Sequence, residues 1–269
     1  MYAEILKLAK KSDFLSMEQC IADFSILGRY LGPRLAEYAQ KSYKRAEVHK
    51  FPSGKQVIKA LCAKDITFTD KHGRIVHPDT IENINLPTKM KVKFKVQKNR
   101  RNGEEKEVLA DTNNEEMCPV KAAYRIALRA KLLGQTQELP MGVYQYKNTE
   151  RRYLVGSDIS QFLRKIAKKA HPDITEAELK RFSAHSFRVT AAVLLHEQGH
   201  DGDFIKIQLR WLGDSYRVYL RSTRTILERH TTALGKSAAL SIKLANIPDT
   251  ATHSVEQTDI DEMGEYHEW

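Results

Sequence analysis

The sequence predicts a mainly helical α+β fold with one small antiparallel sheet. Apolar residues recur at helical spacing over residues 1–45, apolar and polar residues alternate over 55–110, and helical spacing returns after Pro119. The chain has 269 residues, of which 41% are hydrophobic. This length supports one large domain or two small ones, and this composition excludes wholesale disorder.

The first segment is expected to be helical over residues 1–45. MEQCIADFSILGRYLG (17–32) carries apolar residues at helix spacing, and PRLAEYAQ (33–40) continues the same register after a Gly-Pro interruption. The helix is therefore predicted to resume beyond Pro33.

The sheet is predicted from two alternating segments. VIKALCAKDITFTDKHGRIV (57–76) contains a turn at His72-Gly73, and MKVKFKVQKNRRNGEEKEVLA (90–110) contains one at Asn102-Gly103. Each segment is typical of an antiparallel hairpin.

Helical periodicity governs the rest of the folded part, and no internal repeat is present. Gly213 is a candidate break in the last of the helical runs. These runs are VKAAYRIALRAKLLG (120–134), DISQFLRKIAKKA (158–170), SFRVTAAVLLHEQG (186–199), FIKIQLRWLG (204–213) and, overlapping it, residues 205–234.

The charge is unevenly distributed. The net charge is +10, but residues 241–269 contain one basic and seven acidic residues, so the first 240 residues carry +16. A body this basic attracts polyanions such as nucleic acid, although a basic surface that only confers solubility gives the same composition. We predict a folded domain over 1–240 and an acidic, disordered tail over 241–269.

Several classes of protein are disfavoured. No apolar run reaches the ~18 residues that a membrane span needs, and the N-terminus lacks the apolar core of a secretion signal. The three cysteines are odd in number and widely spaced, which argues against a disulfide framework or a four-cysteine zinc site. We therefore expect a protein of a reducing compartment, neither secreted nor bound to a membrane.

Four side chains suit phosphate chemistry. His185 and Arg188 are three residues apart, so they share one helical face; arginine offers a rigid fork of donors to phosphate oxygens, and histidine moves protons near neutral pH. Trp211 and Tyr219 follow, just before the basic stretch YLRSTR. Tyrosine can act as a covalent nucleophile. Each of these signals is weak when taken singly.

Taken in order, they resemble the catalytic C-terminus of a tyrosine recombinase. The segment AHSFRVTAAVLLHEQGHDGDFIKIQLRWLGDSYRVYLRST (184–223) is most similar to the DIRS-like and Crypton-like integrases of eukaryotic transposons. The positions that carry the resemblance are His185, Arg188, Gly199, Arg210-Trp211 and Tyr219-Leu220-Arg221.

The resemblance extends upstream and covers residues 32 to about 224. Gly-Pro-Arg-Leu-Ala-Glu (32–37) matches the family's Gly-x-Arg-x-x-Glu and supplies Arg34 and Glu37. KVKFKVQKNRRNGEEKEV supplies the family's hairpin lysine as Lys98, and MCPVKAAYRIAL matches the start of the next helix. The implied fold is the catalytic domain of a DNA breaking-rejoining enzyme.

The resemblance implies a role for each residue. Tyr219 Oη would attack a DNA phosphorus, forming a 3′-phosphotyrosine and freeing a 5′-hydroxyl; no cofactor, neither ATP nor a metal, is implied. Arg34 and Arg188 would bind the non-bridging oxygens. Lys98 would protonate the departing 5′-oxygen, and His185 would orient or deprotonate the nucleophile.

The remaining roles follow from the same resemblance. Trp211 stands where many relatives have a second histidine and would donate its indole N–H to a phosphate oxygen. Glu37 would brace Arg34 or its neighbours. The partner would be double-stranded DNA bound by a homo-oligomer, a tetramer, located in the nucleus of a eukaryote and otherwise in the cytoplasm. Contacts with the DNA backbone are expected from Arg100, Arg101, Arg210 and Arg221.

Other interpretations of these residues remain open. Arg34 and Glu37 match an ordinary surface ion pair. Tyr216 is a rival nucleophile, and a tryptophan in an apolar run is commonly buried in a core. Lys98 has neighbours that could replace it or track the backbone with it, namely Lys95, Arg100, Arg101 and Lys106.

Two other functions are considered. A recombinase-derived protein that binds DNA without cutting it is one, since only about 30 residues precede Arg34 whereas family members carry an N-terminal clamp domain. The second, a zinc metallopeptidase, is suggested by His196-Glu197-Gln198-Gly199-His200, which matches His-Glu-x-x-His. Gly199 and the following Asp-Gly-Asp favour a helix end there instead, and we predict no metal.

Overall fold

The computed structural model describes residues 2–97, 102–147 and 150–220, together with Thr232. Contacts divide the chain into Met1–Thr223 and Arg224–Trp269, and every element below belongs to the first unit. The predicted boundary at residue 240 and the acidic tail lie outside the described residues. With 46% helix, 17% strand and small antiparallel sheets, the predicted mainly helical α+β class is confirmed. None of the described helices is long and apolar enough to cross a membrane.

The N-terminal segment forms two helices, α1 (Tyr2–Ala9) and α2 (Met17–Leu31). The Ser16 hydroxyl caps α2 by accepting the N–H of Gln19 at 3.2 Å. Gly32 ends α2 in the left-handed conformation, with φ 50°. The predicted helical continuation over 33–40 is therefore wrong: after Gly32 and Pro33 only a short 3-10 turn, η1 (Leu35–Glu37), forms.

The predicted antiparallel sheet is confirmed, with strand order β4-β3-β5-β6. Gly73 (φ 78°) and Gly103 (φ 85°) provide the left-handed positions of its two predicted turns. Along β5, Met90, Val92 and Phe94 are buried while Lys91 and Lys93 between them face solvent, as the alternation requires. The strands are β3 (Ile66–Thr69), β4 (Ile75–Val76), β5 (Lys89–Phe94) and β6 (Glu104–Leu109).

Two further hairpins were not predicted, because their strands are too short to establish an alternating pattern. One pairs β1 (Val48–Lys50) with β2 (Gln56–Ile58). The other pairs β7 (Val143–Tyr146) with β8 (Glu150–Tyr153).

Most of the later helices match their predicted segments. The short helix α5 was not predicted. The run over 205–234 is interrupted between Arg210, which adopts a left-handed conformation, and Gly213, which is extended, so the predicted break at Gly213 lies within the interruption. The helices are α3 (Pro119–Leu132), α4 (Gly156–Ala170), α5 (Glu176–Lys180), α6 (Ser186–Glu197), α7 (Gly202–Leu209) and α8 (Arg217–Leu220). The other 3-10 turns are η2 (Ala63–Asp65), η3 (Glu82–Asn85), η4 (Glu115–Met117) and η6 (Asp214–Tyr216).

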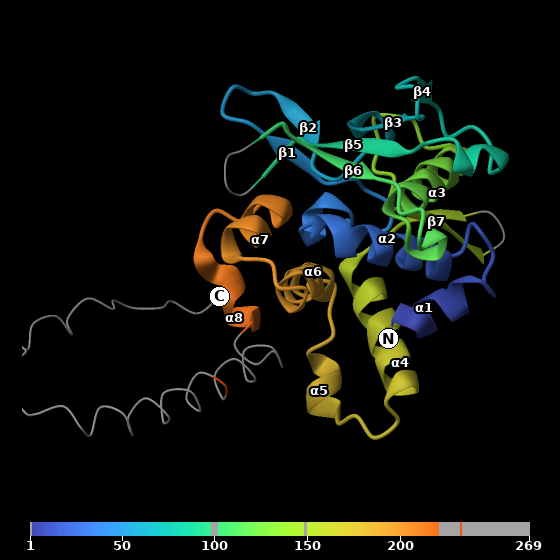
Figure 1. The fold of residues 1–269 in the computed structure, drawn as a ribbon. Coiled ribbons are helices and arrows are strands. Elements are labelled where there is room, and N and C mark those ends of the chain that lie inside the picture. Colours follow the sequence, from blue (N-terminus) through green and yellow to red (C-terminus); the bar gives the residue numbers. More distant parts are fainter. Residues whose placement is uncertain (1, 98–101, 148–149, 221–231, 233–269) are drawn as a thin grey trace, which may run out of the picture. The chain divides into compact units, whose positions relative to one another are not determined.

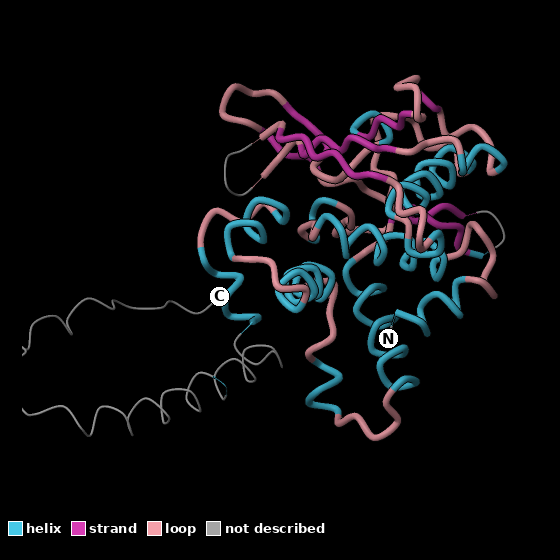
Figure 2. The backbone as a smooth tube through the Cα atoms, in the orientation of Figure 1, coloured by secondary structure: helices cyan, strands magenta, loops and turns pink. Residues whose placement is uncertain are grey.

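Helix α2 is central to this unit. It packs against α3, α6 and β7, and lies between the four-stranded sheet and the helices α4 and α6 (Figures 1 and 2). Gly28 allows the close approach of α6, since a Cβ added there would lie 2.8 Å from Phe187 Cβ. Asp23, fully buried in α2, binds the buried guanidinium of Arg129 at 2.5 Å. This packing brings the end of α2 next to the start of α6.

Candidate active site

The predicted nucleophile, Tyr219, meets His185 across 34 residues of chain. Tyr219 Oη lies 2.9 Å from His185 Nε2, and the ring centroids are 5.6 Å apart. Helix α8 carries the tyrosine, and the histidine directly precedes α6. Partial burial, followed by the positive charge of Arg188, lowers the pKa of His185 below its usual 6.5. The imidazole is therefore neutral at pH 7, the form able to accept a proton from a phenol.

Arg188 lies in the first turn of α6, three residues after His185. It is buried, its Nη1 donates to the Gly32 carbonyl at 2.5 Å, and its Cζ lies 4.1 Å from the centroid of the Trp211 ring. Burial and then the charges of Arg34 and Arg210 lower the pKa of Arg188 to about 10, so the side chain is still cationic at neutral pH. The negative charges of Glu37 and of an ionised Tyr219 act in the opposite direction and raise the pKa of Arg188.

Trp211 packs against both Tyr216 and Tyr219. Its ring makes edge contacts with Tyr219, at 5.9 Å between centroids, and with Tyr216, at 6.3 Å. Its Nε1 is buried, and no acceptor within the described part of the chain bonds to it. This unpaired donor lies beside an arginine and a phenol, and because it is buried an anionic ligand would reach it only after neighbouring side chains move.

Arg34 and Glu37 are not an ordinary surface pair. Glu37 is buried, and its Oε2 accepts the backbone N–H of Arg34 at 2.8 Å. The Arg34 guanidinium, with its side chain 26% exposed, reaches Glu37 Oε1 at 3.4 Å. The carboxylate therefore holds the guanidinium at the surface of the site.

The structure corrects the expectation for Arg210. Its side chain has no exposed surface, and both terminal nitrogens bind Glu37, at 3.0 and 2.9 Å. Its Cζ also lies 3.4 Å from the centroid of the Phe94 ring. A guanidinium enclosed in this way cannot contact a DNA backbone in this conformation, so Arg210 belongs to the interior of the site.

Gln97 is a further site residue, which sequence reasoning missed. Its Oε1 accepts from Arg210 at 3.1 Å and from Arg34 at 3.4 Å, and its Nε2 donates to Glu104 at 2.9 Å. It therefore ties the β5–β6 hairpin to both arginines. Its only sequence signal is its place beside Lys98, and that place does not distinguish a site residue from an ordinary surface glutamine.

Most residues of the β5–β6 hairpin and the C-terminal segment that are predicted to contact DNA are not described by the structure. Lys98, Arg100, Arg101 and Arg221 lie outside the described residues. Of the rivals to Lys98, Lys95 pairs with the buried carboxylate of Asp65 and donates to Cys62 Sγ at 3.1 Å. Lys106 Nζ donates to the Ile207 carbonyl at 2.7 Å. Lys95 and Lys106 therefore both have local partners.

Tyr216, the predicted alternative to Tyr219 as nucleophile, is buried, with 2% of its surface exposed.

The zinc-protease pattern does not form a continuous metal-bearing helix. Helix α6 ends at Glu197, and Gly199 has φ 85°. His200 lies beyond that turn and stacks on Phe204, with 4.1 Å between centroids. Within the described residues, no group of three or more His, Cys, Asp or Glu side chains could hold a metal ion.

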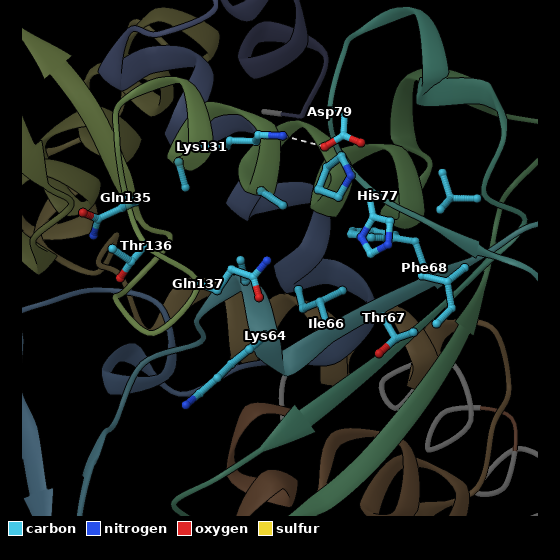
Figure 3. Close-up of a pocket in the computed structure, with 16 residues that line it drawn as sticks. Lys64, Ile66, Thr67, Phe68, His77, Asp79, Lys131, Gln135, Thr136 and Gln137 are labelled. Atoms are coloured by element: carbon cyan, nitrogen blue, oxygen red, sulfur yellow. Dashed lines mark hydrogen bonds and ion pairs between the residues drawn. The ribbon is translucent and has the colours of Figure 1, made fainter.

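A cavity of about 450 Å³ lies elsewhere, between β3, β4, the end of α3 and the loop that follows α3 (Figure 3). Lys131 and Asp79 form an ion pair at its wall, 2.5 Å apart, and His77 lines it as well. None of the described candidate residues lines this cavity. At the candidate site, His185 is exposed and Tyr219 and Arg34 are partly exposed, whereas Arg188 and Arg210 are buried.

Comparison with known proteins finds no matching protein-family model and no similar curated protein. Membership of the tyrosine recombinase family therefore stays a prediction that follows from the motifs.

Proposed function

We propose that the chain is a DNA strand transferase of the tyrosine recombinase class, which cleaves and rejoins DNA through Tyr219. The observation that carries this proposal is the 2.9 Å contact between Tyr219 Oη and His185 Nε2, beside the buried cation of Arg188. A nucleophile, a base and a cation together are the requirements of phosphoryl transfer.

In the proposed reaction, His185 Nε2 takes the phenol proton as Tyr219 Oη bonds to the phosphorus. The bond from phosphorus to the 5′-oxygen breaks, and that oxygen receives a proton, for which Lys98 is the proposed donor. Arg34 and Arg188 offset the charge on the non-bridging oxygens, and Trp211 Nε1 offers one further donor. The reverse attack by a 5′-hydroxyl rejoins DNA and releases the tyrosine.

Double-stranded DNA is the proposed substrate, because the first 240 residues carry a net charge of +16. Recombination joins two duplexes, so we propose that a homotetramer assembles on DNA and supports integration or excision of a mobile element. In a eukaryotic cell this activity implies residence in the nucleus. The buried Arg210 is excluded from the proposed DNA contacts, whereas Arg100, Arg101 and Arg221 are retained.

A nicked duplex tests this proposal, because cleavage near the nick releases a short fragment and traps the protein on DNA. The wild type is expected to form a covalent adduct that survives denaturation, and Tyr219→Phe is expected to form none. Tyr216→Phe is the matched control, since Tyr216 is 2% exposed and the change removes one hydroxyl. Adduct formation by Tyr219→Phe would contradict the assignment.

The second candidate, a recombinase-derived DNA-binding protein without cleavage activity, is separated by the same assay. Its basic surface would give DNA binding that weakens steeply as salt rises. Binding of this kind with no adduct from the wild type, over a set of nicked sequences, would favour that function over cleavage.

A further inference from the structure

Arg210 occupies a backbone conformation that arginine rarely adopts. Its φ is 59° and its ψ is 43°, at the position that ends helix α7. Side chains with a Cβ are strained in this region, and glycine is the residue that most often fills it at a helix end. A glycine there would relieve the strain, whereas the arginine is held in this conformation by the contacts of its side chain.

The side chain is also enclosed, which is costly for a permanent cation. It has 0% exposure, and its Nε is buried without a partner within the described residues. Its two terminal nitrogens grip the two carboxylate oxygens of Glu37, and the ring of Phe94 covers its face. Bidentate pairing of this kind fixes the carboxylate in position and orientation.

The same Glu37 carboxylate also binds Arg34, so fixing Glu37 fixes the position of Arg34. The oxygen at 2.9 Å from Arg210 Nη2 also accepts the Arg34 backbone N–H, and the oxygen at 3.0 Å from Arg210 Nη1 also contacts the Arg34 guanidinium. Gln97 Oε1 bridges the same two arginines from the hairpin side. A continuous chain of polar contacts therefore runs from the interior of the site to the partly exposed Arg34.

We propose that Arg210 is a positioning residue that acts through Glu37 to hold the Arg34 guanidinium on a non-bridging phosphate oxygen. This inference rests on the proposed function and gives Arg210 a task other than a backbone contact. Arg34 is the member of the chain that reaches solvent, since Glu37 and Arg210 are buried.

The test measures single-turnover adduct formation by the full chain on two nicked duplexes. One has an ordinary phosphodiester at the cleavage site, and the other has a methylphosphonate, in which a methyl group replaces one charged oxygen. Arg210→Gly suits the left-handed backbone and removes the guanidinium. Arg34→Ala removes the group it is proposed to position, and Arg74→Gly is the control, because Arg74 is exposed and pairs with Asp70.

We expect Arg210→Gly to cleave the phosphodiester about 100-fold more slowly than the wild type, the effect of a misplacement of about 1 Å. On the methylphosphonate, Arg210→Gly and Arg34→Ala should both approach the wild-type rate, because the charge that Arg34 offsets is absent. Arg74→Gly should resemble the wild type on both substrates. Circular dichroism checks that each variant is folded, and Arg210→Lys, which keeps the charge but loses the bidentate grip, replaces Arg210→Gly if the latter is unfolded.

Three results would overturn the proposal. A wild-type phosphodiester rate in the Arg210 variant would show that the grip on Glu37 does not matter. An equal loss on both substrates in a folded variant would assign Arg210 to something other than the charge on that oxygen. No adduct from the wild type would reject the proposed function, and this inference with it, so the two failures are distinguishable.

Discussion

His185 Nε2 and Tyr219 Oη lie 2.9 Å apart, although the two residues come from separate helical segments. The contact depends on the turn at Arg210, because that turn ends α7 and lets the chain return toward α6 as η6 and α8. The imidazole is therefore positioned beside the phenol, and its Nε2 accepts the phenol proton in the tautomer whose ring hydrogen is on Nδ1.

The pH dependence of cleavage should report on His185. Its pKa is lowered by burial and by Arg188, so the neutral imidazole persists to a pH below 6.5. The cleavage rate should fall only as the pH drops through this lowered pKa. His185→Ala should cleave more slowly than the wild type, and its rate should not show this decrease at acidic pH. His200→Ala, which changes an exposed histidine, is the control. An unchanged decrease at acidic pH in His185→Ala would assign it to another group.

The same shift affects stability. A folded state whose histidine pKa is lowered binds protons less readily than the unfolded chain, so the contribution of His185 to the free energy of unfolding declines as pH falls below 6.5. Urea unfolding at several pH values should show a shallower decline for His185→Ala than for the wild type. Parallel curves would contradict the lowered pKa.

Trp211→Phe should separate cleavage from folding. The change removes the buried Nε1, which has no acceptor among the described residues, but retains a ring against Tyr219. Loss of one preorganised donor should slow adduct formation by about 10²–10³-fold. Trp211→His returns a ring N–H and should recover part of the rate. A rate for Trp211→Phe equal to that of the wild type would confine Trp211 to packing.

Glu37→Gln should destabilise the fold as well as the site. Removing the carboxylate leaves the buried Arg210 guanidinium without its counter-charge. Breaking a buried ion pair in this way lowers the free energy of unfolding by about 3–5 kcal/mol, measurable by urea titration. Glu107→Gln is the control, because Glu107 is half exposed and pairs with the partly exposed Lys89 and Lys91, so the expected change is within about 0.5 kcal/mol. Equal effects of the two variants would show that the Arg210 contact is not stabilising.

Gly28→Ala should disturb the packing of α2 against α6. The new Cβ would lie 2.8 Å from Phe187 Cβ, so one helix must shift. Overpacking of this kind costs about 1–3 kcal/mol in the free energy of unfolding, which thermal or urea unfolding can measure. The control is Gly213→Ala, since no atom lies within 4 Å of a Cβ at that position. Equal stability of Gly28→Ala and wild type would mean that the helices separate without cost.

Most of the fold follows from local periodicity. Alternation over 55–110 correctly predicted the β3–β4 and β5–β6 hairpins, and helical spacing correctly predicted α2, α3, α4, α6 and α7. The failures lie at short elements and at ends. The hairpin of β7 and β8 is too short for periodicity, and the stop at Gly32 depends on a left-handed backbone that an apolar pattern does not reveal.

The candidate site divides in the same way. The types and order of Arg34, His185, Arg188, Trp211 and Tyr219 are properties of the sequence, and they were enough to nominate phosphate chemistry. The pairing of His185 with Tyr219 and the burial of Arg188 required the packed helices. The interpretation of Arg210 and Gln97 changed most. Arg210 was expected to contact DNA but lies in the interior, and Gln97, which was not predicted, connects Arg210 with Arg34.

The sequence by itself determined the α+β class and the basic first 240 residues, and it nominated the residues proposed to act on a phosphate. The tertiary structure alone decided which guanidinium is enclosed and which reaches solvent. Local spacing specifies the face of a helix or strand, whereas burial depends on chain segments far apart in sequence. Arg210 is buried because Glu37 from the η1 turn and Phe94 from β5 close around it, 173 residues away in the case of Glu37.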